Sequence, residues 1–184
     1  MGTSGSDPPL GAERRGSLST RTTHPAFIEG LGDLLGRVGA HAQIENPLAG
    51  LTKGQVFSMA RDTVGPDPAS ILLSNTHSCG WTGQRAFGIS PIIQCGVCFG
   101  CVLRRSAFVA SSLADRTAYI APQAASPLSH RISEISVIRA VQDFVRRGVR
   151  AADVAAMSLP PSYPATGAMK LCQRGVDELR TYVT

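Results

Sequence analysis

The pattern of apolar and polar positions predicts a mostly helical chain. Apolar residues recur at helical spacing in six segments, and one short run at 42–45 suits a β-strand. The segments expected to be helical are 25–38, 53–64, 98–113, 132–148, 151–157 and 169–183. Helices therefore dominate the expected fold.

The start of the first predicted helix suits either capping or anion binding. Thr23 or His24 fits the N-cap position. Pro25 fits the first helical turn, and Gly39 ends the helix. Backbone N–H groups at a helix start can hold an anion, and Arg21 is placed to assist. Simple capping is the alternative, and the sequence leaves both open.

By composition, the chain divides into three parts. Residues 1–18 are rich in Gly, Ser and Pro and are expected to form a flexible segment or a loop. Residues 19–120 hold the chemical motifs. Residues 127–184 are expected to form a helical extension that packs on the core or on another subunit. The extension shows no catalytic constellation, and its Cys172 is expected to be an inert buried thiol.

Length and charge narrow the class of protein only a little. The 184 residues suit one ordinary domain, or one domain with an appendage. The net charge of +5 is spread in short pairs, which is weak evidence for an anionic small ligand or RNA. No apolar run approaches about 18 residues, so no membrane partner is expected. The polar N-terminus lacks a secretory signal, so we expect a reducing, cytoplasmic compartment.

Four of the five cysteines form a metal-binding pattern. Cys79, Cys95, Cys98 and Cys101 have the spacing C-x15-C-x2-C-x2-C. Four thiolates can enclose one zinc ion in a tetrahedral site that keeps no open coordination position. Such a metal shapes the fold and does not activate water.

Other interpretations of these cysteines remain open. A reducing compartment disfavours disulfides. A bacterial iron–sulfur motif continues with x3-Cys-Pro, whereas Val102-Leu103-Arg104-Arg105 follows Cys101 here. His77 lies two residues before Cys79 and is expected to be a neighbour of the site rather than a ligand. The spacing therefore favours zinc over iron–sulfur or no metal.

The cysteine motif and its flanks resemble a known family. The run from Cys95 to Phe108, with Asp115-Arg116-Thr117 after it, resembles the C-terminal signature of the 7-cyano-7-deazaguanine synthases, and Cys79 matches the upstream ligand of that family. Pro47-Leu48 followed by Leu51-Thr52-Lys53 resembles its Pro-Leu…Lys segment. Residues 19–27 are most similar to a divergent branch linked to antiphage defence. The resemblance covers about residues 16–120.

This resemblance implies a fold and an activity. Members are ATP-using carbon–nitrogen ligases of the adenine-nucleotide α-hydrolase superfamily, which convert 7-carboxy-7-deazaguanine and ammonia to the nitrile in queuosine biosynthesis. Their ATP-binding loop, Ser-Gly-Gly-x-Asp-Ser, is absent from this sequence. The implied fold is α/β, here the mostly helical C-terminal part with a zinc knuckle and a helical extension. The chain is expected to be inactive alone and to use ATP only with a missing segment or another chain that carries the loop.

The resemblance also implies roles for individual residues. Lys53 is expected to be catalytic, and Arg21 and His24 to face the substrate. Arg104 or Arg105 is expected to pair with an anionic group, since a guanidinium fork suits carboxylate or phosphate, and a surface ion pair is the alternative for each. Asp115 is expected to hydrogen-bond the purine-like edge of a deazaguanine-type molecule. A homodimer remains open.

Two other functions are compatible with the sequence. A non-catalytic zinc module that binds RNA or a protein fits the basic balance, and steep salt dependence of binding would reveal RNA. An electron-transfer protein with an iron–sulfur centre is the third hypothesis, and a colourless preparation counts against it.

Overall fold

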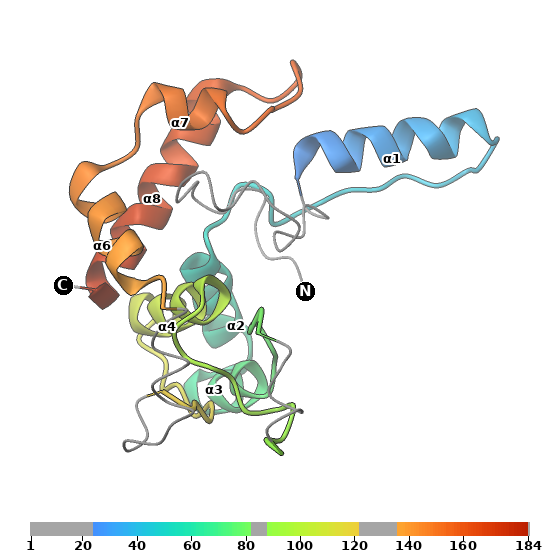
Figure 1. The fold of residues 1–184 in the computed structure, drawn as a ribbon. Helices are drawn as coiled ribbons and strands as arrows, with labels where there is room; N and C mark the ends of the chain where they lie inside the picture. The colour runs from blue at the N-terminus through green and yellow to red at the C-terminus, as the bar shows by residue number, and fades with distance from the viewer. Residues whose placement is uncertain (1–23, 82–87, 122–135, 184) are drawn as a thin grey trace. The chain divides into compact units, whose positions relative to one another are not determined.

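The computed structural model of the chain describes residues 24–81, 88–121 and 136–183. The chain forms two compact units, which are described separately below. Of the described residues, the first unit comprises 53–81, 88–121, 136–146 and 177–183, and the second comprises 24–52 and 147–176. The helices are α1 (Pro25–Arg37), α2 (Lys53–Val64), α3 (Pro66–Ser74), α4 (Phe99–Ala110), α6 (Ile138–Arg147), α7 (Ala151–Ala155) and α8 (Ala165–Val183) (Figure 1).

The core of the first unit lies where α2 and α3 meet and where α2 packs against α4. Phe57 of α2 meets Phe108 of α4 edge to face, with ring centroids 4.9 Å apart, a favoured aromatic geometry. Ala69, Ala107 and Leu113 are buried with them. This packing explains why α4 buries most of its residues, including the turn that carries Cys101.

A second cluster in the first unit surrounds the cysteines. Cys79, Cys95 and Cys101 are buried with Val97 and Ile120. A single parallel β-bridge joins Gln94 to Tyr119 and brings the chain after α4 back beside the cysteine loop. The cysteines therefore sit in a small apolar core of their own.

The second unit is held by contacts between segments far apart in sequence. The His24 side chain caps α1 by accepting from the Ala26 N–H at 3.2 Å, and its other ring nitrogen lies 2.8 Å from the Met157 carbonyl oxygen. Arg174 donates to the Gly50 carbonyl oxygen at 2.7 Å. No residue of α1 is buried among those the structure describes, although the helix is amphipathic.

The last helix, α8, runs through both units: its residues up to Val176 belong to the second and those from Asp177 to the first. Within the first unit, Gln142 of α6 donates to the Val183 carbonyl oxygen at 3.1 Å. Glu178 accepts from the Gly54 N–H at 3.0 Å, in the first turn of α2. An acceptor there satisfies one of the free N–H groups of a helix start.

Most predicted helices are confirmed, with two errors. The strand predicted at 42–45 was wrong, because 40–46 has no regular secondary structure. Helix α3 is not among the predicted helices: a proline can end a helix, but Pro66 and Pro68 lie in the first turn of α3, where proline fits. Helix α6 begins at Ile138, and 132–135 lies outside the described residues, as do 1–18 and Arg21. The predicted boundaries of the 19–120 and 127–184 parts stay predictions.

Among the described residues, no helix combines the length and apolarity that a bilayer crossing requires.

Candidate metal centre

The four predicted cysteines converge. Their sulfur atoms all lie within 4.8 Å of one another, and none of them is in a disulfide. The Cys95 and Cys101 sulfurs are 3.8 Å apart, and those of Cys79 and Cys98 are 3.9 Å apart. A tetrahedral zinc site with bonds of about 2.3 Å places its sulfurs about 3.8 Å apart. The donor set and its spacing therefore fit a zinc ion.

Two glycines allow the loop to fold this tightly. Gly96 has a φ of +86°, and a Cβ there would lie 2.7 Å from the Ala121 carbonyl oxygen. A Cβ on Gly100 would lie 2.0 Å from the Ser78 carbonyl oxygen. Both distances are below the closest approach of real Cβ atoms. Glycine at position 100 lets the Cys95–Cys101 loop approach the segment that carries Cys79, and glycine at position 96 lets it approach Tyr119 and Ala121.

Backbone N–H groups point at the sulfurs. The Cys95 N–H donates to the Cys79 sulfur at 3.3 Å, and the Cys98 N–H to the Cys95 sulfur at 3.3 Å. The Gly80 N–H donates to the Cys98 sulfur at 3.4 Å. Donors of this kind stabilise negative charge on sulfur, as metal-bound thiolates require.

The crowding of four thiols separates their pKa values. A hydrogen bond from Cys101 is the main cause that lowers the pKa of Cys79 and of Cys98. The pKa of Cys101 is raised, first by its hydrogen bond with Cys79. The shifts are opposed because a hydrogen bond between two thiols favours the charged form of one and the protonated form of the other. A divalent cation removes this conflict, because it attracts all four thiolates at once.

Lys53 contacts Ser78, the residue that precedes the first clustered cysteine. Its ammonium group donates to the Ser78 hydroxyl at 3.1 Å, and Ser78 precedes Cys79. The Ser78 N–H donates to the Gln94 side-chain oxygen at 3.0 Å, and the Gln94 amide nitrogen donates to the Thr76 carbonyl oxygen at 3.1 Å. Gln94 is only 1% exposed. This glutamine, which the sequence did not single out, fixes the loop that positions Lys53.

Arg104 is fully buried, and its guanidinium is engaged within the protein. It donates to the Thr76 hydroxyl at 2.6 Å, to the Thr117 hydroxyl at 3.0 and 3.2 Å, and to the Leu73 carbonyl oxygen. It also lies over the Phe108 ring, 5.2 Å from the centroid. In this geometry Arg104 fastens the end of α3 to the segment after α4. Its predicted pairing with a ligand stays a prediction that this geometry does not favour.

Arg105 has a different environment. Its guanidinium carbon lies 5.0 Å from the centroid of the Tyr119 ring and 5.1 Å from that of Tyr182. The Tyr119 hydroxyl donates to Asp115 at 2.7 Å, and Asp115 also accepts from the Thr117 N–H at 3.0 Å. Burial, together with the hydrogen bond to Asp115, raises the pKa of Tyr119, and burial raises that of Tyr182. Arg105 and Asp115, two residues predicted to bind the substrate, thus both contact Tyr119.

The remaining predicted residues are not part of this group. His24 belongs to the second unit, and both its ring nitrogens are engaged, which corresponds to the capping that the sequence left open. Arg21 lies outside the described residues. His77 is exposed and is not a member of the cysteine cluster. Cys172 is buried, with its sulfur 3.9 Å from that of Met157, as expected of an inert thiol.

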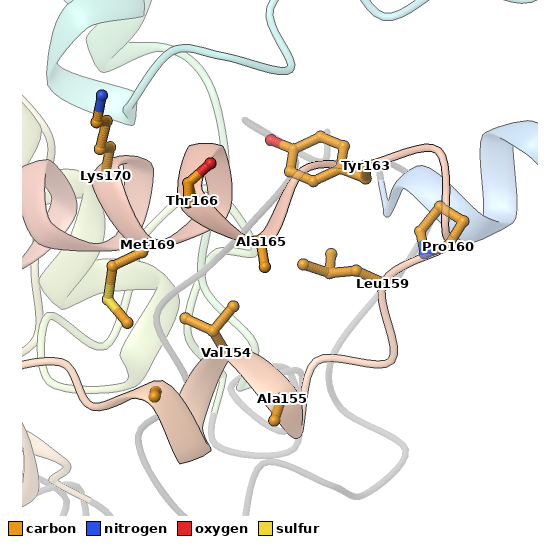
Figure 2. A pocket seen from close by; sticks show the side chains of 10 residues that line it. Val154, Ala155, Leu159, Pro160, Tyr163, Ala165, Thr166, Met169 and Lys170 are labelled. Carbon is orange, nitrogen blue, oxygen red and sulfur yellow. The ribbon is translucent and has the colours of Figure 1, made fainter.

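The second unit contains a cavity of about 600 Å³ between α7, α8 and the loop that joins them. Its lining is mostly apolar, and Figure 2 shows Val154 and Met169 pointing between the two helices. The Lys170 amino group points away from them (Figure 2). Tyr163, Thr166 and Lys170 are its polar lining residues, and the lining contributed by the described residues contains no carboxylate, histidine or cysteine.

The chain is similar to known proteins over about half of its length. The family model described as "Queuosine biosynthesis protein QueC" matches residues 23–112. A 7-cyano-7-deazaguanine synthase of Nitratidesulfovibrio vulgaris is 38% identical over 63 residues, which are 34% of this chain and 26% of that protein. The synthase of Caulobacter vibrioides is 34% identical over 76 residues, 41% of this chain and 31% of that protein. No solved structure matches the chain.

The match includes four of the helices described above, α1, α2, α3 and α4, together with all four clustered cysteines. The aligned segment spans only about a quarter to a third of the curated relatives' length. The resemblance drawn from the cysteine motif is confirmed: residues 23–112 match the model of the QueC family of queuosine biosynthesis proteins.

Proposed function

We propose that this chain is the zinc-containing C-terminal portion of an ATP-dependent ligase that modifies a 7-deazaguanine, converting the 7-carboxy to the 7-cyano compound. The observation that carries the proposal is the four-cysteine cluster within the family region, coupled to Lys53 through Ser78. The names of the curated relatives support the reaction type. The fold proposed for the complete enzyme is that of the adenine-nucleotide α-hydrolases.

The metal in this proposal has a structural role. Zinc would be held by Cys79, Cys95, Cys98 and Cys101, and four thiolates leave it no position for substrate. It supplies rigidity to the knuckle that ends in α4. Because Ser78 precedes Cys79, the same rigidity extends to the Lys53 ammonium group.

Lys53 is the proposed catalytic residue. Adenylation of a carboxylate adds negative charge around the α-phosphorus as pyrophosphate leaves, and a fixed cation stabilises such charge. Lys53 is half-buried and held by Ser78, so its ammonium group loses little freedom when the charge develops. Asp115 is proposed to accept hydrogen bonds from the purine-like edge of the substrate.

ATP is proposed to bind elsewhere, on a further segment or on another chain. The sequence contains no Ser-Gly-Gly-x-Asp-Ser loop to cradle phosphates. The antiphage-defence branch and a homodimer stay open as refinements of this proposal. Binding of RNA or a protein by a non-catalytic zinc module is the competing function, and it requires no nucleotide-binding partner.

Reconstitution tests the proposal. The full chain is combined with the ATP-binding part of a synthase, 7-carboxy-7-deazaguanine, ammonia and ATP, and the nitrile and AMP are measured. We expect turnover by the combination and none by the chain alone. Lys53→Ala should lower turnover by at least tenfold with an unchanged thermal transition, because a first-turn lysine contributes little to stability.

Lys170→Ala is the matched control, since Lys170 is an exposed lysine of the second unit. It should leave turnover unchanged. Production of AMP by the isolated chain, or tight salt-dependent RNA binding with no turnover in the combination, would contradict the proposal.

A further inference from the structure

Arg105 lies against two aromatic rings. Its guanidinium carbon is 5.0 Å from the Tyr119 centroid and 5.1 Å from the Tyr182 centroid. A cation within about 6 Å of a ring centroid is attracted by the ring. Two such contacts hold the planar group and leave its hydrogen-bonding edge as the part that can meet a ligand.

That edge is largely unused by the described residues. A guanidinium has five N–H donors. In the described part of the chain, its one acceptor is the Gly96 carbonyl oxygen, to which Arg105 Nη1 donates a long hydrogen bond of 3.4 Å. Arg104, the adjacent residue, contrasts with it: its guanidinium donates to three protein groups at closer range.

One of these two tyrosines, Tyr119, packs against the loop that carries the cysteines. Gly96 lies between Cys95 and Cys98, and a Cβ on it would lie 3.2 Å from the Tyr119 Cβ, so the Tyr119 ring packs directly against the loop. The Tyr119 hydroxyl is in turn held by Asp115 at 2.7 Å. A metal that orders the cysteine loop therefore also orders Tyr119, one of the two rings against Arg105.

Both tyrosines lie outside the family match, which ends at residue 112. Tyr119 follows the match closely in sequence, whereas Tyr182 is in the last turn of α8. The end of α8 is anchored in the first unit at two further points. Gln142 bonds the Val183 carbonyl oxygen, and Glu178 accepts from the Gly54 N–H in the turn that begins with Lys53. The end of the C-terminal helix therefore contacts Arg105 directly and Gly54, the residue after Lys53.

We propose that Arg105 is a preset oxyanion-binding residue, which takes one carboxylate or phosphate group of a small ligand, and that Tyr182 is the positioning residue that presets it. A planar guanidinium group held against aromatic rings can donate two parallel hydrogen bonds to the two oxygens of such a group. The inference deepens the proposed function, on which it rests only for the identity of the ligand. It makes the C-terminal helix part of the binding site and not only a structural extension.

Titration with simple oxyanions tests this inference. The zinc-loaded full chain, labelled with ¹⁵N, is titrated with inorganic phosphate and separately with acetate, at constant ionic strength set with chloride. The Nε–H signal of Arg105, assigned with Arg105→Lys, is followed. We expect a saturable shift at Arg105, and the stronger of the two probes identifies phosphate or carboxylate as the preferred group. The signal of Arg180, an exposed arginine of α8 that pairs with Asp177, should shift only weakly and without saturation.

Variants of Tyr182 separate positioning from general stability. Tyr182→Phe keeps the ring and should keep the affinity within about twofold, whereas Tyr182→Leu should raise the apparent Kd at least fivefold with zinc content unchanged. A linear, unsaturable response at Arg105, or equal affinity in Tyr182→Leu, would overturn the inference. If Tyr182→Leu does not fold, Tyr182→Met serves as the ring-less variant, and the wild-type titration still decides whether Arg105 binds oxyanions. Saturable binding without turnover in the reconstituted enzyme would refute the proposed function and leave this inference standing.

Discussion

Replacing Gly100 by alanine is expected to damage the metal centre from a position that is not a ligand. Gly100 lies in the first turn of α4, between Cys98 and Cys101. A Cβ there would lie 2.0 Å from the Ser78 carbonyl oxygen, and real Cβ atoms essentially never come closer than 3.0 Å. The two segments must therefore separate by about 1 Å. Because Ser78 precedes Cys79, this shift moves one of the four sulfurs away from the others.

The expected magnitude follows from two opposing effects. Alanine in place of glycine inside a helix gains about 1 kcal/mol from helix propensity. Overpacking of a tight contact costs about 1–3 kcal/mol, and a backbone oxygen, which cannot rotate away, places this case at the upper end. We expect a net loss of about 2 kcal/mol in stability with zinc bound. A loss of this size that falls on the metal-bound state corresponds to a weakening of zinc affinity by more than tenfold.

Competition with a chromogenic chelator measures the zinc affinity, and thermal unfolding measures the stability. Gly175→Ala is the matched control, since Gly175 is also in a helix and a Cβ there meets nothing within 4 Å. It should raise stability by about 0.5–1 kcal/mol and leave zinc affinity unchanged. If Gly100→Ala behaves like Gly175→Ala, the contact between α4 and the Cys79 segment does not exist as described.

Three further predictions concern stability. Cys98→Ser should abolish the cooperative thermal transition of the first unit or lower its midpoint strongly, because metal-binding free energy at a closed site is folding free energy; a transition unchanged by both this variant and chelation would contradict it. Arg104→Lys should lower the free energy of unfolding, measured by chemical denaturation, by about 2–4 kcal/mol, because a lysine cannot reproduce the fork that reaches Thr76, Leu73 and Thr117. The control is Arg116→Lys at an exposed ion pair, which should lower it by less than about 1 kcal/mol. Asp153 has its pKa lowered, first by the hydrogen bond from Arg147, so its contribution is present above the ordinary pKa of a carboxyl and is lost as pH falls through the lowered value. The destabilisation of Asp153→Asn, about 1 kcal/mol at pH 7, should therefore shrink as pH falls below the ordinary pKa of a carboxyl; a difference that stays constant into the acid range would refute the pairing.

The sequence predicted the metal centre better than its surroundings. The spacing of cysteines can be read directly from the sequence. It therefore predicted without knowledge of the fold that four cysteines form one cluster, namely Cys79, Cys95, Cys98 and Cys101. Arg104 and Arg105 are adjacent and chemically identical, and only the packing of α4 separates the fully buried one from the one that lies against two tyrosines. Spacing within one helix cannot reveal which partners other segments bring to each face.

Long-range partners were the general weakness of the prediction. Gln94 is next to a ligand, yet a glutamine in a loop is more often exposed, and its burial depends on Thr76 and Ser78 arriving from another segment. Tyr182 and Glu178 lie in a helix that looked like a separate extension, and nothing local indicates that its last turns belong to the first unit. Helix α3 was missed for a local reason, because prolines that begin a helix also end one.

X-ray absorption spectroscopy at the zinc edge, with elemental analysis of the same sample, tests the central claim most directly. The account predicts about one zinc per chain, coordinated by four sulfurs at about 2.3 Å with no nitrogen or oxygen in the coordination shell. Iron with inorganic sulfide, or zinc bound by fewer than four sulfurs, would contradict it.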